Sequence, residues 1–379
     1  MELNELLKAA IEQEASDLHL KVGSPPILRI YGELVPMTSE KKLAQEDTLK
    51  ISFSVMNPNQ REVFKKRNDI DLAYSVSGLG RFRCNIFMQR GAIGMVFRSI
   101  PFKIASFEEL NLPDVVRKIA LEQRGLILVT GTTGCGKTTT LASMIDYINA
   151  ARTSNIITIE DPIEFLHRDK RSIVNQREIG VDTESFARAL RAALRQDPDV
   201  ILVGEMRDFE TIQTCLTAAE TGHLVLSTLH TIDATETVNR IIAVFPPYQH
   251  KQVRMQLSSI LKGIISMRLM PRSDNRGRVP AVEVLIATST IRDCIIDPDK
   301  TKLIPDMVAQ GAVHYNMQTF DQSLLNLYKS GLITYEEALR GATNPDDFIL
   351  KVKGVQSTSD LTFESSKDQM KIERFTKQG

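Results

Sequence analysis

The residues with the clearest chemistry lie in one glycine-rich stretch, GTTGCGKTT, at positions 131–139. Gly131, Gly136, Lys137 and Thr138 complete the spacing G-x-x-x-x-G-K-T, which follows the apolar run LILVT and precedes a helical pattern. In such a loop the backbone amides surround phosphates, the lysine reaches the β- and γ-phosphates, and the threonine hydroxyl ligates Mg²⁺. The sequence therefore predicts a nucleotide and Mg²⁺ site formed by Gly131, Thr132, Thr133, Gly134, Cys135, Gly136, Lys137, Thr138 and Thr139.

Acidic residues follow two further apolar runs. DVILVGEMRD places Glu205 directly after one run, and IITIEDPIEF places Glu160 and Glu164 at the end of another and just beyond it. Because the carboxyl ends of parallel strands meet at the sheet edge where phosphates bind, we expect these acids to converge there. Glu205 or Glu164 would orient or deprotonate water, and Glu160 would support the metal. Which of Glu164 and Glu205 is the base stays open, and any one of these acids is also compatible with a solvated loop.

Two histidines flank a third apolar run, HLVLSTLHT, in a chain that has six histidines. His223 and His230 are seven residues apart, which on an extended strand separates them by roughly 23 Å. One zinc ion cannot bind both, because zinc-binding pairs on one element lie about three to five residues apart. The residues alone leave two interpretations: polar side chains that end a buried strand, or members of a site at a strand end.

The composition limits the class of protein. Lys plus Arg and Asp plus Glu number 47 each, and a net charge of zero argues against a protein with a dominant nucleic-acid-binding surface. No apolar run approaches about 18 residues and the N-terminus lacks a signal-peptide core, so we expect no transmembrane segment. The four cysteines, Cys84, Cys135, Cys215 and Cys294, form no CxxC pair, which is typical of a cytosolic protein without structural zinc.

A parallel sheet is needed to hold these site residues. From Gly125 the runs LILVT, NIITIE, DVILVG and HLVLSTL alternate with helical stretches, which predicts an α/β domain with crossover helices. The preceding residues have an opening helical pattern and strand-like runs, with a hairpin near Gly91, as in a small α+β domain. We therefore expect an N-terminal domain at 1–100, a linker at 101–121, a P-loop core at 122–292, a helical region at 293–355 and a polar tail at 356–379.

Five segments together resemble the signatures of one family. SDLHL, GTTGCGKTTT, ITIEDPIEF, ALRQDPDVILVGEMRD and AAETGHLVLSTLHT are similar, in this order, to motifs of the secretion ATPase (GspE–PilT) superfamily, the hexameric P-loop motors of type IV pili and type II secretion. The resemblance covers residues 14–350 and is greatest to PilT-type retraction ATPases, because the chain is short and lacks the four-cysteine zinc module of assembly and secretion motors. It implies an α/β fold in which a PAS-like α+β domain precedes a RecA-like ATPase domain with C-terminal helices.

The resemblance also implies an activity and roles for particular residues. The chain would hydrolyse ATP with Mg²⁺ as a homohexamer and would power type IV pilus retraction and twitching motility. His223 and His230 would form the His box that relays nucleotide state, and Arg81, Arg83 and Arg98 of the PAS-like domain would act on phosphate charge. The implied partners are an inner-membrane platform protein of the PilC kind and a paralogous retraction ATPase, with the motor cytoplasmic and peripheral at the inner face of the cytoplasmic membrane.

Three departures from the family pattern bear on this interpretation. Thr132 stands where proline is common, Cys135 where serine is common, and TIRDCI near residue 290 replaces the retraction signature AIRNLI. The first two leave the loop amides in place, whereas the third keeps alternatives open: an accessory PilU-like retraction paralogue, or a hexameric nucleic-acid translocase. Cys135 is also near a helix N-terminus, where thiolates are favoured, so it is either a redox-sensitive residue or a plain substitute for serine.

Overall fold

The computed structural model describes residues 2–30, 32–100, 104–274 and 276–354. Its contacts divide the chain into two compact units, residues 1–103 with 164–166, and residues 104–163 with 167–379. Each unit has its own sheet and its own hydrophobic core. The polar tail expected at 356–379 and the first residues of the expected linker, 101–103, lie outside the described residues.

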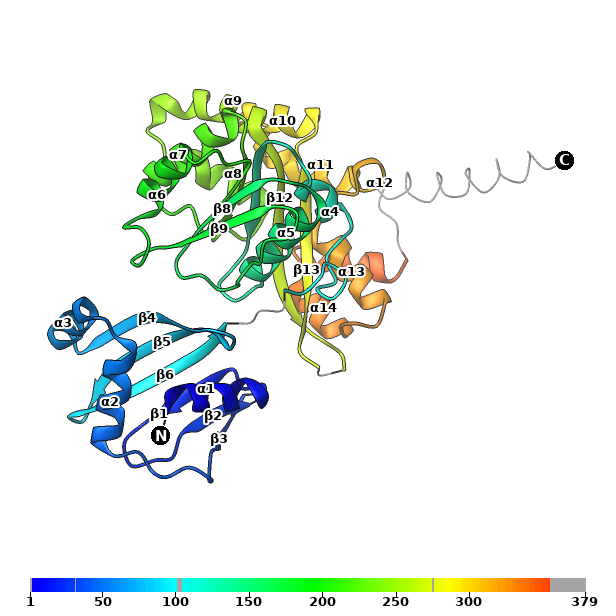
Figure 1. The fold of residues 1–379 in the computed structure, drawn as a ribbon. Helices are drawn as coiled ribbons and strands as arrows, with labels where there is room; N and C mark the ends of the chain where they lie inside the picture. The colour runs from blue at the N-terminus through cyan, green and yellow to red at the C-terminus, as the bar shows by residue number, and fades with distance from the viewer. Residues whose placement is uncertain (1, 31, 101–103, 275, 355–379) are drawn as a thin grey trace. The chain divides into compact units, whose positions relative to one another are not determined.

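The first unit is an antiparallel sheet in the order β3-β2-β1-β6-β5-β4, with helices packed on one face (Figure 1). Burial alternates along β5, because only one face is covered: Phe82, Cys84 and Ile86 are buried, whereas Arg83 is exposed. The elements are α1 Leu3–Glu12, β1 Asp17–Leu20, β2 Ile27–Ile30, β3 Glu33–Pro36, α2 Gln45–Val55, α3 Pro58–Arg67, β4 Asp69–Val76, β5 Gly80–Gln89 and β6 Ala92–Ile100.

The hairpin between β5 and β6 has a tight turn that suits the twist of its strands. Arg90 and Gly91 connect Gln89 to Ala92, and their φ angles are +48° and +74°. Positive φ at both central residues of a two-residue turn matches the right-handed twist of the flanking strands. The structure thus confirms the hairpin expected near Gly91.

The second unit is built on a mostly parallel sheet in the order β13-β12-β7-β11-β10-β8-β9. The strands β12, β7, β11, β10, β8 and β9 are parallel to their neighbours, and β13 pairs with β12 antiparallel. The four predicted strands are confirmed, whereas β9, β12 and β13 were not predicted. The strands are β7 Gly125–Thr130, β8 Asn155–Glu160, β9 Ile173–Glu178, β10 Val200–Val203, β11 Leu224–Leu229, β12 Leu261–Pro271 and β13 Arg278–Ile286.

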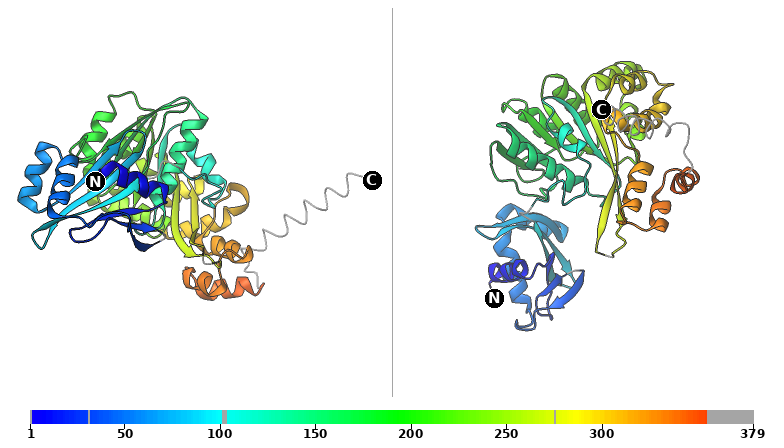
Figure 2. Two further views of the ribbon diagram at one scale, coloured as in Figure 1. Left: turned by 60° about the horizontal axis from the view of Figure 1, so that its bottom comes forward. Right: turned by 90° about the vertical axis from the view of Figure 1, so that its right-hand side faces the viewer.

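Helices cover both faces of this sheet (Figures 1 and 2). α4 and α5 pack on one face, and α6 to α11 contribute to the core on the other. Double burial explains why the central strands are continuous apolar runs: every residue of β7 and of β11 is buried. The helices are α4 Val115–Ala120, α5 Lys137–Ala151, α6 Phe186–Ala193, α7 Phe209–Glu220, α8 Ala234–Ala243, α9 His250–Ile260, α10 Ser289–Ile296 and α11 Ile304–Gln310.

The last helices pack on the far end of the β12–β13 hairpin. Met270 of β12 and Val279 of β13 are buried in one cluster with Phe320 and Phe348. Figure 2 shows the hairpin in yellow running past the helices in orange. These helices are α13 Phe320–Lys329, α14 Tyr335–Gly341 and α15 Pro345–Val352. The short helix α12 Ala312–Tyr315 precedes them, and short 3₁₀ turns lie at η1 Pro247–Gln249 and η2 Thr301–Leu303.

The linker expected at 101–121 requires a correction. Residues 104–121 belong to the second unit, where Val116 and Ile119 of α4 are buried beside α5 and the sheet. Their apolar side chains stabilise that core, so this segment is part of the folded unit rather than a connection. Among the described residues, no helix combines the length and apolar character that crossing a membrane requires.

Candidate active site

The loop between β7 and α5 has the geometry of a phosphate-binding loop. β7 ends at Thr130, and α5 begins at Lys137 with Gly136 as its N-cap at φ +100°. At Gly131 φ is +139°, and a Cβ there would lie 2.5 Å from both Cys135 Sγ and Met267 O, so the backbone path requires glycine. The exposed part of the loop is Thr132, Thr133 and Gly134. An exposed glycine-rich turn before a helix N-terminus can direct backbone amides at an anion.

Lys137 is held inside this loop. The residue is 9% exposed, and its Nζ donates hydrogen bonds to the carbonyl oxygens of Gly131 at 2.8 Å and Thr132 at 2.9 Å. Thr138 and Thr139, the next two residues of α5, are half-buried. The ammonium group therefore lies within the curve of the loop, where it can meet phosphate oxygens.

Two of the predicted acids and one histidine lie at the carboxyl ends of strands in the same sheet as β7. In the sheet order β7-β11-β10-β8, His230 follows β11, Glu205 follows β10, and Glu160 is the last residue of β8. All four strands are parallel, so these residues and the loop lie at the same edge of the sheet. The edge is the carboxyl edge, where ligands bind in open α/β sheets.

Glu205 and His230 come together at this edge. The side chain of Glu205 is 12% exposed, and its Oε2 lies 3.6 Å from His230 Nε2. Arg207 forms an ion pair with the other oxygen, Nε to Oε1, at 2.6 Å. Two bonds between the strand ends fix this arrangement: Thr228 Oγ1 donates to Gly204 O at 2.7 Å, and Met206 N donates to Thr228 O at 3.1 Å.

Glu160 is buried at the end of β8 and accepts two hydrogen bonds. Thr158 Oγ1 donates to Glu160 Oε1 at 2.6 Å, and Gln176 Nε2 donates to the same oxygen at 3.1 Å. Glu160 is 8% exposed. Its carboxylate is thus oriented by its neighbours, as expected of a group that acts on a metal or on its bound water.

His223 lies at the opposite edge of the sheet. It precedes β11, and its Nδ1 lies 2.9 Å from Ala218 O and 3.3 Å from Thr221 Oγ1 at the C-terminal end of α7. Within one chain, His223 and His230 therefore lie at opposite edges of the sheet, although the family resemblance assigns both to one His box. An extended strand of six residues separates them, so only His230 is near Glu205 and the loop.

The three arginines and Glu164 belong to the first unit. Arg83 and Arg98 are directly opposite each other on β5 and β6, on the exposed face of the antiparallel sheet. Arg98 Nε donates to Asp17 Oδ1 at 2.8 Å, and Arg83 Nε lies 3.8 Å from Asp71 Oδ1. Two further candidates are the half-buried Arg81 of β5 and the exposed Glu164, which is grouped with this unit.

A family model described as a type II/IV secretion system protein matches residues 96–319, which is more than half of the chain. The chain belongs to this family. Two similar members of the type II/IV secretion family come from Pseudomonas aeruginosa. The type IV pilus retraction ATPase PilT is 44% identical over 92% of this chain and 100% of its own length. The type IV pilus ATPase PilU is 44% identical over 95% of this chain and 94% of its own length.

A solved structure of the same secretion family has a similar fold. The crystal structure of the pilus retraction motor PilT with bound ADP has a TM-score of 0.85 and 50% identity, covering 92% of this chain and 98% of that one. The expected α/β fold, with an N-terminal α+β domain before a P-loop ATPase domain, is thereby confirmed.

Burial makes Cys135 a poor candidate for a reactive thiolate in this secretion-family chain. The residue is 3% exposed, and burial raises the pKa of its thiol above the usual value, although Lys137 and backbone hydrogen bonds act in the opposite direction. A protonated, covered thiol is a weak nucleophile. The geometry favours the plain substitution for serine over the redox-sensitive interpretation.

Sequence reasoning missed two polar residues near the site, Ser266 of β12 and Glu283 of β13. Both are buried, at 0% and 7% exposed. A single acid within the apolar run VPAVEVLI was the available signal, because an ionisable side chain in a buried strand needs a partner. Without the hairpin β12–β13, however, nothing connected that run to the P-loop.

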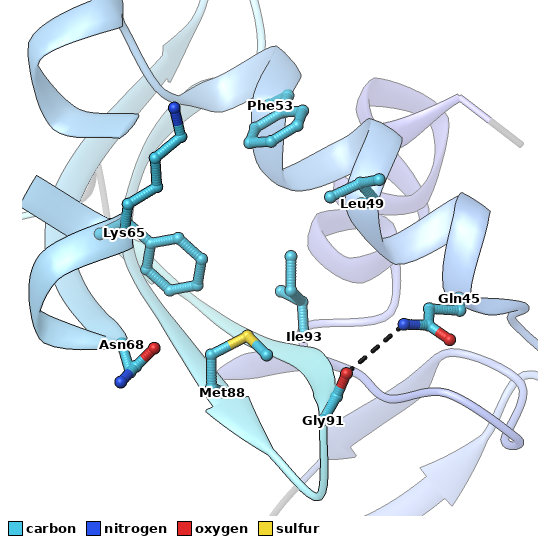
Figure 3. A pocket seen from close by; sticks show the side chains of 9 residues that line it. Gln45, Leu49, Phe53, Lys65, Asn68, Met88, Gly91 and Ile93 are labelled. Carbon is cyan, nitrogen blue, oxygen red and sulfur yellow. Dashed lines mark hydrogen bonds between the residues drawn. The ribbon is translucent and has the colours of Figure 1, made fainter. Parts of the chain in front are cut away.

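The first unit contains an apolar pocket that is separate from this chemistry. It has a volume of about 270 Å³ and lies between α2, α3 and the β5–β6 hairpin (Figure 3). Two of its polar side chains have partners: Gln45 Nε2 donates to Gly91 O at 3.4 Å, and Lys65 Nζ donates to Glu62 Oε1 at 2.8 Å. Phe53, Phe64 and Met88 give it an apolar wall. It lacks the amide cradle that phosphate binding requires.

Proposed function

We propose that this chain is an ATP-hydrolysing motor that powers type IV pilus retraction and twitching motility as a homohexamer. The observation that carries the proposal is the joint arrangement at one sheet edge of the loop holding Lys137 and of the Glu205–His230 pair. Its support comes from the 44% identity with a pilus retraction ATPase over nearly the whole chain.

ATP and Mg²⁺ would be held by the P-loop. The amides of residues 131–136 and the ammonium group of Lys137 neutralise phosphate charge, and the Thr138 hydroxyl ligates the metal. Glu160 would add a carboxylate from the carboxyl end of β8, and an all-oxygen donor set of this kind suits Mg²⁺. When bound, Mg²⁺ would supply positive charge where negative charge develops during phosphoryl transfer.

Glu205 is the candidate base that belongs to the same unit as the phosphate-binding loop. It is half-buried at the carboxyl edge of the sheet, and Arg207 and His230 contact one oxygen each, so its carboxylate is oriented. Glu164 is the alternative base and lies on an exposed segment. Arg81, Arg83 and Arg98 supply guanidinium groups to the phosphates from the first unit of the same chain or of a neighbouring subunit.

His230 would report nucleotide state, because it contacts Glu205 and begins the segment that leads to α8. His223, at the other edge, would act at most through a neighbouring subunit. Hydrolysis would then rotate the N-terminal domain against the RecA-like core and act on an inner-membrane platform protein of the PilC kind. The motor would work in the cytoplasm, peripheral to the inner face of the cytoplasmic membrane.

A second candidate function is an accessory retraction role beside a paralogous ATPase. The observation that favours it is that PilU and PilT of one organism are each 44% identical to this chain. A nucleic-acid translocase is a weaker alternative, because the chain has no net charge.

Two measurements test the proposal. Purified protein should release phosphate from ATP with Mg²⁺, at a rate that DNA and RNA do not change, and should have the native mass of six chains. Cells that lack the gene should keep or gain surface pili and lose twitching. Loss of pili would point instead to an assembly motor, and normal piliation with normal motility to the accessory role.

A further inference from the structure

Three buried polar side chains lie side by side across β7, β12 and β13. Thr130 is opposite Ser266, and Ser266 is opposite Glu283. Thr130 Oγ1 donates to Ser266 Oγ at 3.0 Å, and the Ser266 hydroxyl is close enough to the Glu283 carboxyl group to lower its pKa. Polar groups in a core are costly unless they are paired, so a row that begins beside the phosphate-binding loop calls for a physical account.

The row continues to the segment after His230. Ala234 N, the first amide of α8, donates to Glu283 Oε1 at 2.8 Å. The rest of this segment is held by its own helix: Ile232 N donates to Glu236 Oε2 at 2.7 Å, and Thr231 Oγ1 lies 2.7 Å from Thr237 Oγ1. The bond to Glu283 therefore ties the start of α8 to the sheet.

The surroundings of Glu283 shift the pKa of its carboxyl group in two opposite senses. Burial is the main reason that the pKa of its carboxyl group is raised to about 7, and Asp233, the N-cap of α8, raises it further. The Ala234 amide, Arg268 of β12 and the Ser266 hydroxyl lower it. Arg268 is itself close to Asp321 of α13 and stacks over the ring of Phe320 at 3.8 Å. Ionised Glu283 therefore faces a like charge at the start of α8.

We propose that Thr130, Ser266 and Glu283 connect the phosphate-binding loop to the start of α8, and that Glu283 positions His230 by gaining and losing a proton. Thr130 directly precedes Gly131, and Ala234 is four residues beyond His230. The three side chains therefore link the phosphate-binding loop to the segment that follows His230. Loss of the proton makes Glu283 a stronger acceptor for the Ala234 amide but adds a negative charge beside Asp233, so the start of α8 is held differently in the two protonation states. The inference rests on the proposed function, because it assigns Glu283 to the same hydrolytic site.

The first test is the pH dependence of stability. A carboxyl group whose folded pKa is raised binds its proton more tightly in the folded chain, so its contribution is complete below about pH 4.5 and is lost as the pH rises through about 7. Glu283→Gln keeps an acceptor for Ala234 but cannot ionise. The wild-type melting midpoint should fall relative to that of Glu283→Gln by roughly 5 °C between pH 5.5 and 8.5.

The second test separates positioning from stability. Ser266→Ala removes the hydrogen bond with Thr130. Ser323→Ala is the matched control: it removes the buried hydrogen bond that Val282 N, on the strand of Glu283, donates to Ser323 Oγ at 3.0 Å. We expect Ser266→Ala to lower kcat roughly fivefold with KM for ATP nearly unchanged, and to speed amide exchange at residues 231–237. Ser323→Ala should lower the melting midpoint without either effect.

Two outcomes would overturn the inference. One is a Glu283→Gln protein whose stability and kcat follow the wild-type pH profile through pH 7. The other is a Ser266→Ala protein that exchanges residues 231–237 as slowly as Ser323→Ala does. Amide exchange is measured without ATP, so it decides the matter even for a protein that hydrolyses nothing. Failure of the proposed function would appear separately, as wild-type protein without ATPase activity.

Discussion

The two ends of β11 carry the same side chain in different surroundings. At the carboxyl end His230 lies 3.6 Å from Glu205, beside the strand that leads into the phosphate-binding loop. At the amino end His223 lies 2.9 Å from the carbonyl oxygen of Ala218 and closes the last turn of α7. In a parallel sheet the carboxyl edge collects side chains for chemistry and the amino edge collects contacts that stabilise the helices.

Of the substitutions that test this difference between the two edges of the sheet, Lys137→Ala should lower the ATPase rate most. It removes the cation at the carboxyl edge, and we expect phosphate release to fall by at least about a hundredfold, because charge neutralisation in the transition state is lost. Lys262→Ala is the matched control, since Lys262 pairs with Glu122 at 3.1 Å near the amino edge. Its ATPase rate should stay within about twofold of wild type. Equal losses in the two variants would contradict the division of roles.

Glu205→Gln should come next, with a loss of about a hundredfold in kcat. The amide is nearly isosteric, so ATP should still bind, but it cannot take a proton from water. Asp199→Asn tests the other end of the same strand, where Asp199 Oδ2 accepts from Asn155 N at 2.8 Å. That variant should hydrolyse ATP normally. Turnover by Glu205→Gln within a few-fold of wild type would transfer the base to Glu164.

Substituting each of the two histidines that flank β11 compares the two edges of the sheet within one strand. His230→Ala should lower kcat roughly tenfold and flatten the ATP dependence of the rate in the hexamer, while nucleotide binding persists. His223→Ala should instead lower the free energy of unfolding by about 1 kcal/mol, because a helix carbonyl loses its partner. Steady-state kinetics and thermal melts of both variants decide. A rate loss for His223→Ala with unchanged stability would place it at a subunit interface site.

Cys135→Ser should have the smallest effect. Burial raises the pKa of the thiol, so peroxide should inhibit the wild type and the serine variant to the same small extent. ATPase rates before and after peroxide, with and without ATP, check this. Inhibition confined to the wild type and prevented by ATP would restore the redox-sensitive interpretation.

Much of the second unit could be predicted because its strands are buried on both faces. Such strands read as unbroken apolar runs, and the acids and the histidine that follow them are easy to place at one edge. The glycine spacing located the loop, and the structure gave a reason for Gly131 in the close approach of Met267. The order of the strands in the sheet could not be predicted from the sequence pattern. The contact between Glu205 and His230 depends on that order, so only the structure revealed it.

The features that escaped prediction depend on pairing between distant segments. β9, IVNQRE, lies at the edge of the sheet, and its two apolar residues are followed by four polar ones, so it has no strong strand signal. His223 and His230 were given one role because the family resemblance assigns both to the His box, although they flank opposite ends of one strand. Glu283 depends on Ser266 and on Ala234, 49 residues away, and no local pattern contains that relation.

The β12–β13 hairpin has a mechanical consequence. Its pairs run without interruption from Gly263 with Ile286 to Pro271 with Arg278, so the two strands move as one ribbon. One part lines the loop, where Met267 O would meet a Cβ at Gly131, and the far end is embedded among α13, α14 and α15. A displacement of those helices is therefore expected to shift the phosphate-binding loop through the paired strands. A shift of the loop is likewise expected to displace the C-terminal helices.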